Sequence, residues 1–321
     1  MEGNTDRYDY IIVDSNNFFN RYYSVEQANT KDESFEANTE CIANALRGIN
    51  KLGREYGNSS TEFYMLFDNA KSKMNVRKLI DPAYKLNRQK KSPAFYRSLD
   101  MFRLILLSYD DRMHVVFGTG HEADDIAPVI VNKVSGRILV VSEDMDWCRL
   151  ITDEVHLFNR SGIVGKSEFL DKYGFVPTED SIILYKTIHG DTVDNIPIGI
   201  KNFPKHLTIR LVGDYKDIYD VKENLDIIEY LSDTWKSRIK ENISRMYLNH
   251  ELVSYVSLGE SEIDKCTIDC KFKPKILKTL YETLNFNIGG VDKRLQYWLQ
   301  HEQGRKQVED DLFKMPKPKR W

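Results

Sequence analysis

The feature that most constrains the fold of this chain is a series of apolar runs that end in acidic residues. Such runs lead into Asp14, into Asp68, into the cluster Glu122-Ala-Asp-Asp125 and into the pair Asp144 and Asp146. Runs of this length are typical of buried strands, and stretches with helical spacing separate them. Strands that alternate with helices favour a parallel, doubly wound sheet. The sequence therefore predicts an α/β fold with a mostly parallel central sheet flanked by helices.

The predicted elements change character near residue 165. Before it we expect helices and strands in alternation, with helices at 35–56, 94–109 and 122–134, strands at 8–14, 61–68, 113–117, 137–142 and 154–158, and a turn at 15–17. Beyond it we expect mainly helices, at 167–173, 178–189 and much of 216–302, with a loop-rich hairpin at 189–213 and at most a short strand pair near 252–258 and 267–273. The pattern predicts an α/β domain at 1–165, a helical domain at 166–305 and a disordered basic tail at 306–321.

Composition and charge narrow the class of protein. With 41% hydrophobic and 30% charged residues, no apolar run near about 18–20 residues and a polar N-terminus, we expect a soluble chain without a membrane span or signal peptide. The four cysteines lack metal-finger spacing, which favours reduced thiols in a cytoplasmic protein, and we expect a monomer. Residues 71–91 hold eight basic side chains against one acid. A basic segment in a chain with acidic clusters suggests metal ions next to a polyanion.

The acidic residues are expected to converge. In a parallel sheet the carboxyl ends of all strands lie on one edge, where ligands bind. Asp144 and Asp146 share a face if their segment is extended, and Asp191 and Asp194 share one if theirs is helical. So many carboxylates at close range need cations, and hard oxygen ligands suit Mg²⁺ or Mn²⁺. Two such ions about 4 Å apart suit phosphoryl chemistry. Any one of these acids could equally be an ordinary helix cap or turn residue, but the whole set favours a site.

Six motifs together resemble the 5′-nuclease superfamily, the flap endonucleases and 5′→3′ exonucleases with a PIN-like core. They are Ile12-Val-Asp14, Phe67-Asp-Asn-Ala-Lys-Ser72, Tyr84-Lys-Leu-Asn-Arg88, Glu122-Ala-Asp-Asp125, Ser142-Glu-Asp-Met-Asp146 and Gly190-Asp-Thr-Val-Asp-Asn-Ile-Pro197. The match covers about residues 8–215, and the second motif is most similar to phage ribonuclease H. The resemblance implies a basic helical arch at 71–97 and a helix–three-turn–helix DNA-binding element at about 182–214.

The resemblance also implies roles for single residues. A first metal would be held by Asp14, Asp68, Glu122 and Asp124, with Asp125 as outer-shell support. Asp144 would lie between the metals, and a second metal would be served by Asp146, Asp191 and Asp194. The 5′ strand would meet Arg77, Lys78, Tyr84, Lys85, Arg88, Lys90 and Lys91, with Tyr84 able to stack on an unpaired base. Asp68, Asp144, Arg77 and Lys85 would be the residues on which catalysis depends most.

The hairpin departs from the family pattern. The usual glycine-rich turn is replaced by Ile198-Gly-Ile-Lys-Asn-Phe203, in which only Gly199 remains. Loss of glycines puts the usual backbone grip on duplex and on a potassium ion in doubt. We expect Lys201 and Lys205 to supply side-chain contacts instead.

The sequence as a whole predicts a structure-selective 5′ nuclease that uses two Mg²⁺ ions, with Mn²⁺ as a substitute. Its substrates would be DNA with a 5′ flap, nick or free 5′ end and RNA–DNA hybrids, as in primer removal during phage-type replication. The tail motif Asp310-Asp-Leu-Phe313 could dock a sliding clamp or single-strand-binding protein, although a tail without a partner is the commoner case. The alternatives are a PIN-type ribonuclease of single strands and a catalytically silent flap- or fork-binding protein.

Overall fold

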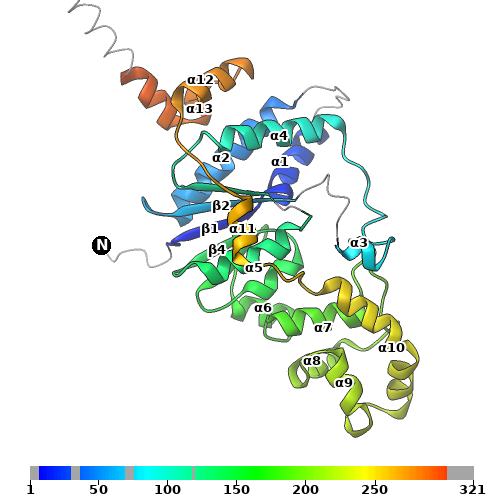
Figure 1. Cartoon of the computed structure of the whole chain (residues 1–321). Helices are drawn as coiled ribbons and strands as arrows, with labels where there is room; N and C mark the ends of the chain where they lie inside the picture. Colours follow the sequence, from blue (N-terminus) through cyan, green and yellow to red (C-terminus); the bar gives the residue numbers. More distant parts are fainter. Residues whose placement is uncertain (1–6, 30–36, 69–75, 118–119, 302–321) are drawn as a thin grey trace, which may run out of the picture. The chain divides into compact units, whose positions relative to one another are not determined.

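A seven-stranded sheet centred on β1 (Tyr10–Asp14) organises the structure (Figure 1). The strand order is β6-β5-β4-β1-β2-β3-β7. The other strands are β2 (Glu62–Phe67), β3 (Met113–Phe117), β4 (Ile138–Val141), β5 (Val155–Asn159), β6 (Gly162–Val164) and β7 (Thr267–Asp269). β1 pairs in parallel with β2 and β4, β4 pairs in parallel with β5, and β5 pairs antiparallel with β6. The prediction of a mostly parallel α/β sheet is confirmed.

The computed structural model describes residues 7–29, 37–68, 76–117 and 120–301. The chain divides into two units, each with its own internal contacts. The first unit comprises residues 1–18, 56–91 and 114–268, and the second comprises 19–55, 92–113 and 269–321. The predicted division at residue 165 stays a prediction.

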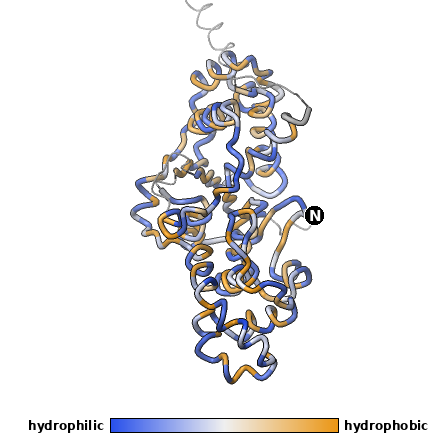
Figure 2. The backbone as a smooth tube through the Cα atoms, turned by 90° about the vertical axis from the view of Figure 1, so that its right-hand side faces the viewer, coloured by the Kyte–Doolittle hydropathy of each residue, from blue (hydrophilic) through white to orange (hydrophobic). Residues whose placement is uncertain are grey.

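Burial explains why β1 is almost wholly apolar. Ile11, Ile12 and Val13 are fully buried, as expected for a central parallel strand with both faces covered. In the first unit, one hydrophobic cluster runs from Ile12 through Ala127 and Leu184 to Ile239. That cluster joins the sheet to the helices that follow it in the sequence. Figure 2 shows hydrophobic (orange) and hydrophilic (blue) stretches intermixed along the backbone tube, as expected for amphipathic elements.

The helices of the first unit lie mainly beyond β4. They are α3 (Val76–Ile80), α5 (Ala123–Lys133), η1 (Met145–Leu150), α6 (Lys166–Tyr173), α7 (Glu179–His189), α8 (Lys205–Asp214), α9 (Ile218–Asn224), η2 (Leu225–Ile227), α10 (Asp233–Val253) and α11 (Glu260–Cys266). α8 occupies the second part of the predicted loop-rich hairpin, so that prediction was wrong for residues 205–213. The possible strand pair near 252–258 and 267–273 does not form as predicted. α10 continues to Val253, and of the two strands only β7 is present.

Residues 15–17 do not form the predicted turn. They open α1 (Ser15–Asn29), because the Asp14 Oδ1 atom accepts a hydrogen bond from the backbone N–H of Asn17 at 3.1 Å. Asp14 therefore caps the helix that follows its strand. This cap fixes the direction of the Asp14 carboxylate at the end of the sheet.

The second unit has its own aromatic packing. Its helices are α2 (Thr39–Tyr56), α4 (Pro93–Leu106), α12 (Pro274–Thr283) and α13 (Ile288–Val291), together with most of α1. The ring of Phe19 lies 5.9 Å from that of Phe95 and 5.1 Å from that of Phe102, centroid to centroid. Ser92 caps α4 and also bonds to the Tyr23 hydroxyl at 2.8 Å. Among the described residues, no helix has both the length and the apolar character needed to cross a bilayer.

Position 199 requires glycine because the backbone of α7 approaches it closely. A Cβ atom there would lie 2.4 Å from the carbonyl oxygen of Thr187 and 3.0 Å from that of Ile188. We expect Gly199→Ala to lower the free energy of unfolding by about 1–3 kcal/mol, because the backbone of α7 must shift. Gly213→Ala is the control, since its Cβ would meet nothing within 4 Å. Urea denaturation of both variants checks this, and equal stabilities would show that the turn is looser than described.

Candidate metal centre

Carboxylates gather at the carboxyl ends of the central strands, as the sequence predicted. Asp14 ends β1, Asp68 follows β2, Asp124 lies in the first turn of α5, and Asp144 precedes η1 after β4. We call these four residues the first acidic group. Burial raises the pKa of Asp14 to about 7, and the charges of Asp68 and Asp144 add to the effect. The carboxylates of Asp68 and Asp144 therefore lie near enough to Asp14 for their charges to act on it.

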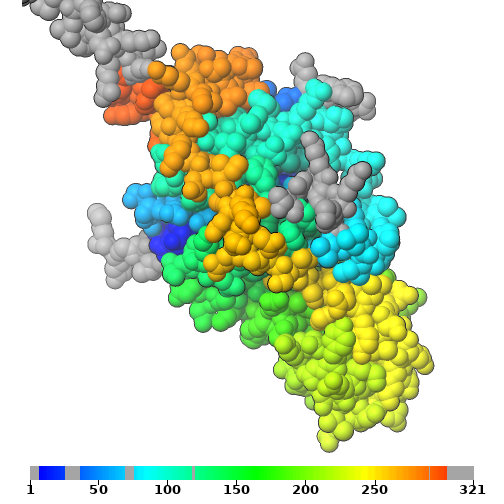
Figure 3. Space-filling model, viewed as in Figure 1, coloured from blue at the N-terminus to red at the C-terminus, as the bar shows by residue number. Residues whose placement is uncertain are grey.

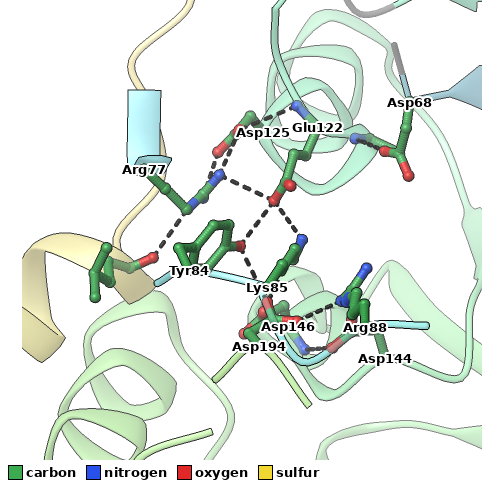
Figure 4. Close-up of polar contacts among 12 residues, drawn as sticks. Asp68, Arg77, Tyr84, Lys85, Arg88, Glu122, Asp125, Asp144, Asp146 and Asp194 are labelled. Carbon is green, nitrogen blue, oxygen red and sulfur yellow. Dashed lines mark hydrogen bonds and ion pairs between the residues drawn. The ribbon is translucent and has the colours of Figure 1, made fainter. Parts of the chain in front are cut away.

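The N-terminus of α5 positions two members of the site. The backbone N–H of Ala123 donates to Asp68 Oδ1 at 2.8 Å, and the Asn16 side chain donates to Asp68 Oδ2 at 3.2 Å. Asp125 accepts from the backbone N–H of Glu122 at 3.3 Å. Burial and the nearby Glu122 charge raise the pKa of Asp68. Figure 4 shows Asp68 and Glu122 on either side of the start of this helix.

Asp124 offers the carboxylate oxygen best suited to a cation. Its Oδ1 atom is buried and accepts no hydrogen bond from any residue that the structure describes. Burial raises its pKa well above the ordinary value, even though Arg77 opposes the shift. Within the described ranges, no salt bridge reaches any member of the first acidic group. A buried, unpartnered carboxylate oxygen among other carboxylates fits a hard divalent cation.

Three further acids form a second acidic group, which we define as Asp146, Asp191 and Asp194. Each offers an oxygen within 4.8 Å of the oxygens of the others. Asp144 and Asp146 do not share an extended face, which corrects that expectation. Asp144 caps η1 and accepts from the backbone N–H of Asp146 at 3.0 Å, so this segment turns into the helix and is not extended. They contribute to different groups.

Two buried cations in the second acidic group were missed by the sequence analysis. Lys186 Nζ donates to Asp146 Oδ1 at 2.5 Å and to Asp191 Oδ2 at 2.7 Å. Arg149 Nη2 lies 2.8 Å from Asp146 Oδ1. Burial alone would raise the pKa of Asp146, but Lys186 and Arg149 hold it well below its usual range. A signal was present: Lys186 interrupts the apolar helical run Ile182–Ile188, and Arg149 follows Asp146 by three residues.

The basic segment folds inward onto the acids. The Tyr84 hydroxyl donates to Glu122 Oε2 at 2.9 Å and to Asp194 Oδ2 at 3.0 Å. Lys85 Nζ donates to Glu122 Oε2 at 2.7 Å, and Arg88 pairs with Asp194. Lys85 and Arg77 overcome the effect of burial and lower the pKa of Glu122. The ring of Tyr84 is buried, so it is not free to stack on a base in this conformation.

Arg77 lies differently from the expectation of an exposed phosphate contact. Its guanidinium makes a two-pronged pair with Asp125 at 2.8 and 2.7 Å and donates to the carbonyl oxygens of Leu252 and Ser254 at 2.9 and 3.0 Å. Asp125 also accepts from the backbone N–H of Val256 at 3.0 Å, so both its oxygens are used. Figure 3 shows segment 76–91 (cyan) against the C-terminal end of α10 (yellow). Arg77 and Asp125 thus both contact Glu122, Arg77 through the Glu122 carboxylate and Asp125 through the Glu122 backbone N–H.

The other predicted DNA contacts differ in exposure. Lys78, Lys90 and Lys91 are exposed on the basic segment, and Lys201 and Lys205 are exposed between α7 and α8. The Asn69–Ser72 part of the second motif, the start of the arch and the tail with Asp310–Phe313 lie outside the described residues.

Comparison with known proteins decides the family. The family described as 5′-3′ exonuclease, N-terminal resolvase-like domain, matches residues 9–174, just over half of the chain. The chain belongs to this 5′-3′ exonuclease family. The resemblance to the 5′-nuclease superfamily is thereby confirmed.

Relatives and solved structures similar to this 5′-3′ exonuclease family member match different shares of its length. The 5′-3′ exonuclease of Buchnera aphidicola subsp. Schizaphis graminum is 28% identical over 263 residues, or 79% of this chain and 85% of the relative. DNA polymerase I of Helicobacter pylori strain J99 is 32% identical over 143 residues, 42% of this chain but 15% of the polymerase. A structure of the bacteriophage T5 flap endonuclease with DNA and metal ions has a TM-score of 0.59 at 20% identity, covering 86% of this chain and 99% of that one. A zinc-bound T5 5′-exonuclease gives 0.59 at 18%, covering 91% and 98%.

The Arg77–Asp125 pair generates a stability prediction. We expect Arg77→Met to lower the free energy of unfolding by about 3–5 kcal/mol, because it leaves the buried Asp125 charge without a partner. Lys78→Met, at the exposed neighbouring position, should change it by no more than about 0.5 kcal/mol. Chemical denaturation measures both. A stable Arg77→Met protein with weakened DNA binding would instead make Arg77 a ligand contact.

Proposed function

We propose that this family member is a Mg²⁺-dependent, structure-selective 5′ nuclease that hydrolyses phosphodiesters of DNA and of RNA–DNA hybrids. The observation that carries the proposal is the first acidic group, in which the charges of Asp68 and Asp144 act on the buried Asp14, and one buried oxygen of Asp124 is without a hydrogen bond from the described residues. Burial of uncompensated charge destabilises a protein, so a bound cation is the best reason for it. Mg²⁺ suits an all-oxygen set, and Mn²⁺ has similar ligand preferences.

The residues divide between two ion positions. Asp14, Asp68, Glu122 and Asp124 would hold one ion, Asp146, Asp191 and Asp194 a second, and Asp144 would lie between them. When bound, such ions supply an activated water and neutralise the leaving oxygen. Lys85 and Arg88 sit beside Glu122 and Asp194, so they can place positive charge next to a phosphate that enters between the two groups.

Substrate choice would follow from the shape of the nucleic acid. Lys78, Lys90 and Lys91 are exposed on one described segment, and Lys201 and Lys205 on another, so backbone phosphates can be contacted without reading bases. This arrangement suits DNA with a 5′ flap, nick or free 5′ end. A role for a cytoplasmic monomer in RNA primer removal during phage-type replication, with a sliding clamp or single-strand-binding protein as partner, is part of the same proposal.

Two substitutions test the nuclease assignment. We expect Asp68→Asn and Asp144→Asn each to reduce Mg²⁺-dependent cleavage of a 5′-labelled flap by more than about 100-fold. Replacing even an outer-shell partner of a metal ligand typically lowers metal affinity or activity by about 10–100-fold. Both variants should still bind the flap, because phosphate contacts are unchanged. Cleavage is followed on denaturing gels with Mg²⁺ and with EDTA, on a flap, a nicked duplex, an RNA–DNA hybrid and single-stranded RNA.

Asp226→Asn is the matched control, because Asp226 is an exposed acid whose carboxylate pairs with the surface residue Lys240. It should cleave like the unaltered protein. Cleavage confined to single-stranded RNA would indicate a single-strand ribonuclease, and binding without any cleavage would indicate a silent flap-binding protein. Either result contradicts the proposal.

The hairpin lysines give a separate prediction. We expect Lys201→Ala combined with Lys205→Ala to weaken duplex binding and to reduce the slope of log affinity against log salt by about 2, because each phosphate contact contributes about 0.9. Lys265→Ala, at an exposed position of α11, should leave the slope unchanged. Fluorescence anisotropy measured between about 50 and 200 mM salt gives both slopes, because this is the range over which phosphate contacts are usually counted. Unaltered affinity and slope in the double variant would remove the two lysines from the interface.

A further inference from the structure

The two acidic groups differ in how their charge is compensated. Every member of the second group contacts a cationic side chain: Lys186 bridges Asp146 and Asp191, Arg149 also pairs with Asp146, and Arg88 pairs with Asp194. In the first group, none of Asp14, Asp68, Asp124 and Asp144 forms a salt bridge with a residue of the described ranges. Of the acids assigned to the first ion, only Glu122 is paired with cations of the described ranges, Lys85 and Arg77, whereas every acid assigned to the second ion is paired.

Lys186 sits where a shared cation would bind. Its Nζ atom lies 2.5 Å from Asp146 Oδ1 and 2.7 Å from Asp191 Oδ2, and its side chain is 5% exposed. A divalent ion held by the same oxygens would lie about 2.0–2.1 Å from each. An ammonium and a divalent ion on the same two oxygens would be in contact, and they would repel each other in a poorly solvated site. Occupancy by one therefore excludes the other.

Among the residues that the structure describes, no cation other than Lys186 forms a salt bridge with Asp191. Arg149 continues to neutralise Asp146 if Lys186 leaves, and its own position is fixed by bonds to the carbonyl oxygens of Asp146 and Val253, both at 2.9 Å. Asp191 Oδ1 accepts from the backbone N–H of Val193 at 2.9 Å, which leaves Oδ2 for the cation. Lys186 is thus the removable cation of the pair, and Arg149 is the fixed one.

We propose that Lys186 and a second divalent ion compete for Asp146 and Asp191, so that the second ion binds more weakly than the first and enters only as the lysine is displaced. This inference rests on the proposed function in assigning the acids to metal ions. Lys186 is then a positioning residue that sets the ion concentration at which the second position fills. It holds the second acidic group together until that ion arrives.

Metal binding without substrate tests the competition. Mn²⁺ is titrated into the full chain, with free ion measured by electron paramagnetic resonance and heat by calorimetry. We expect Lys186→Met to bind the second ion at least 10-fold more tightly and to leave the first unchanged. Lys186→Arg, which keeps the charge, should keep the second site weak. Lys166→Met, which removes an exposed lysine paired with Asp153, should change neither affinity.

A measurement on the unaltered protein covers the case in which Lys186→Met does not fold. The ammonium protons of a buried, bonded lysine exchange slowly, and their NMR signal, assigned by its loss in Lys186→Arg, should disappear as Mg²⁺ fills the second position. A second-ion affinity that is unchanged or weaker in Lys186→Met, or an ammonium signal that persists at saturating Mg²⁺, would overturn the competition alone. Absence of any divalent ion binding would overturn the proposed function itself.

Discussion

The structure depends on how negative charge is accommodated at one edge of a parallel sheet. Parallel strands bring Asp14, Asp68 and Asp144 to the same edge. Burial and the charges of Asp68 and Asp144 raise the pKa of Asp14 to about 7, and burial and the charges of Asp146 and Asp194 raise that of Asp144 to about 6. Such an arrangement destabilises the isolated chain, since each buried carboxylate loses hydration. Part of the charge is compensated internally, by Lys186 and Arg149. The part that is left uncompensated is the part that best fits a divalent ion.

The basic segment serves this edge as well as any nucleic acid. Arg77 ties Asp125 to the end of α10, and Lys85 and Tyr84 hold Glu122 and Asp194 together. Backbone contacts strengthen the link, because the N–H of Lys85 donates to the carbonyl oxygen of Asp194 at 2.8 Å. Lys85 and Arg88, which would contact a phosphate, therefore already form ion pairs with Glu122 and Asp194, which would hold metal. Metal binding and substrate binding should then affect the same set of ion pairs.

Much of this could be predicted from sequence because the relevant signals are local. Apolar runs that end in acids specify β1, β2 and β4, and the parallel order of the sheet then brings Asp14, Asp68 and Asp144 together. The prediction failed where the outcome depends on which partner a polar side chain bonds to. The turn at 15–17 became a helix because Asp14 caps it, and Arg77 turned inward because Asp125 and the carbonyl oxygens of α10 lie far away in the sequence. Lys186 was overlooked because a lysine in an apolar helix is recognisable only once its two carboxylate partners are known.

The central claim is that the first acidic group is a cation site, and anomalous diffraction from a crystal soaked in Mn²⁺ tests it most directly. The account predicts a strong anomalous peak within about 2.0–2.3 Å of carboxylate oxygens of Asp124 and its neighbours Asp14, Asp68 or Glu122, by the usual lengths of such bonds. A peak of lower occupancy should appear at Asp146 and Asp191. Mn²⁺ peaks confined to other parts of the surface, with the Asp124 oxygen contacted only by protein or water, would contradict it.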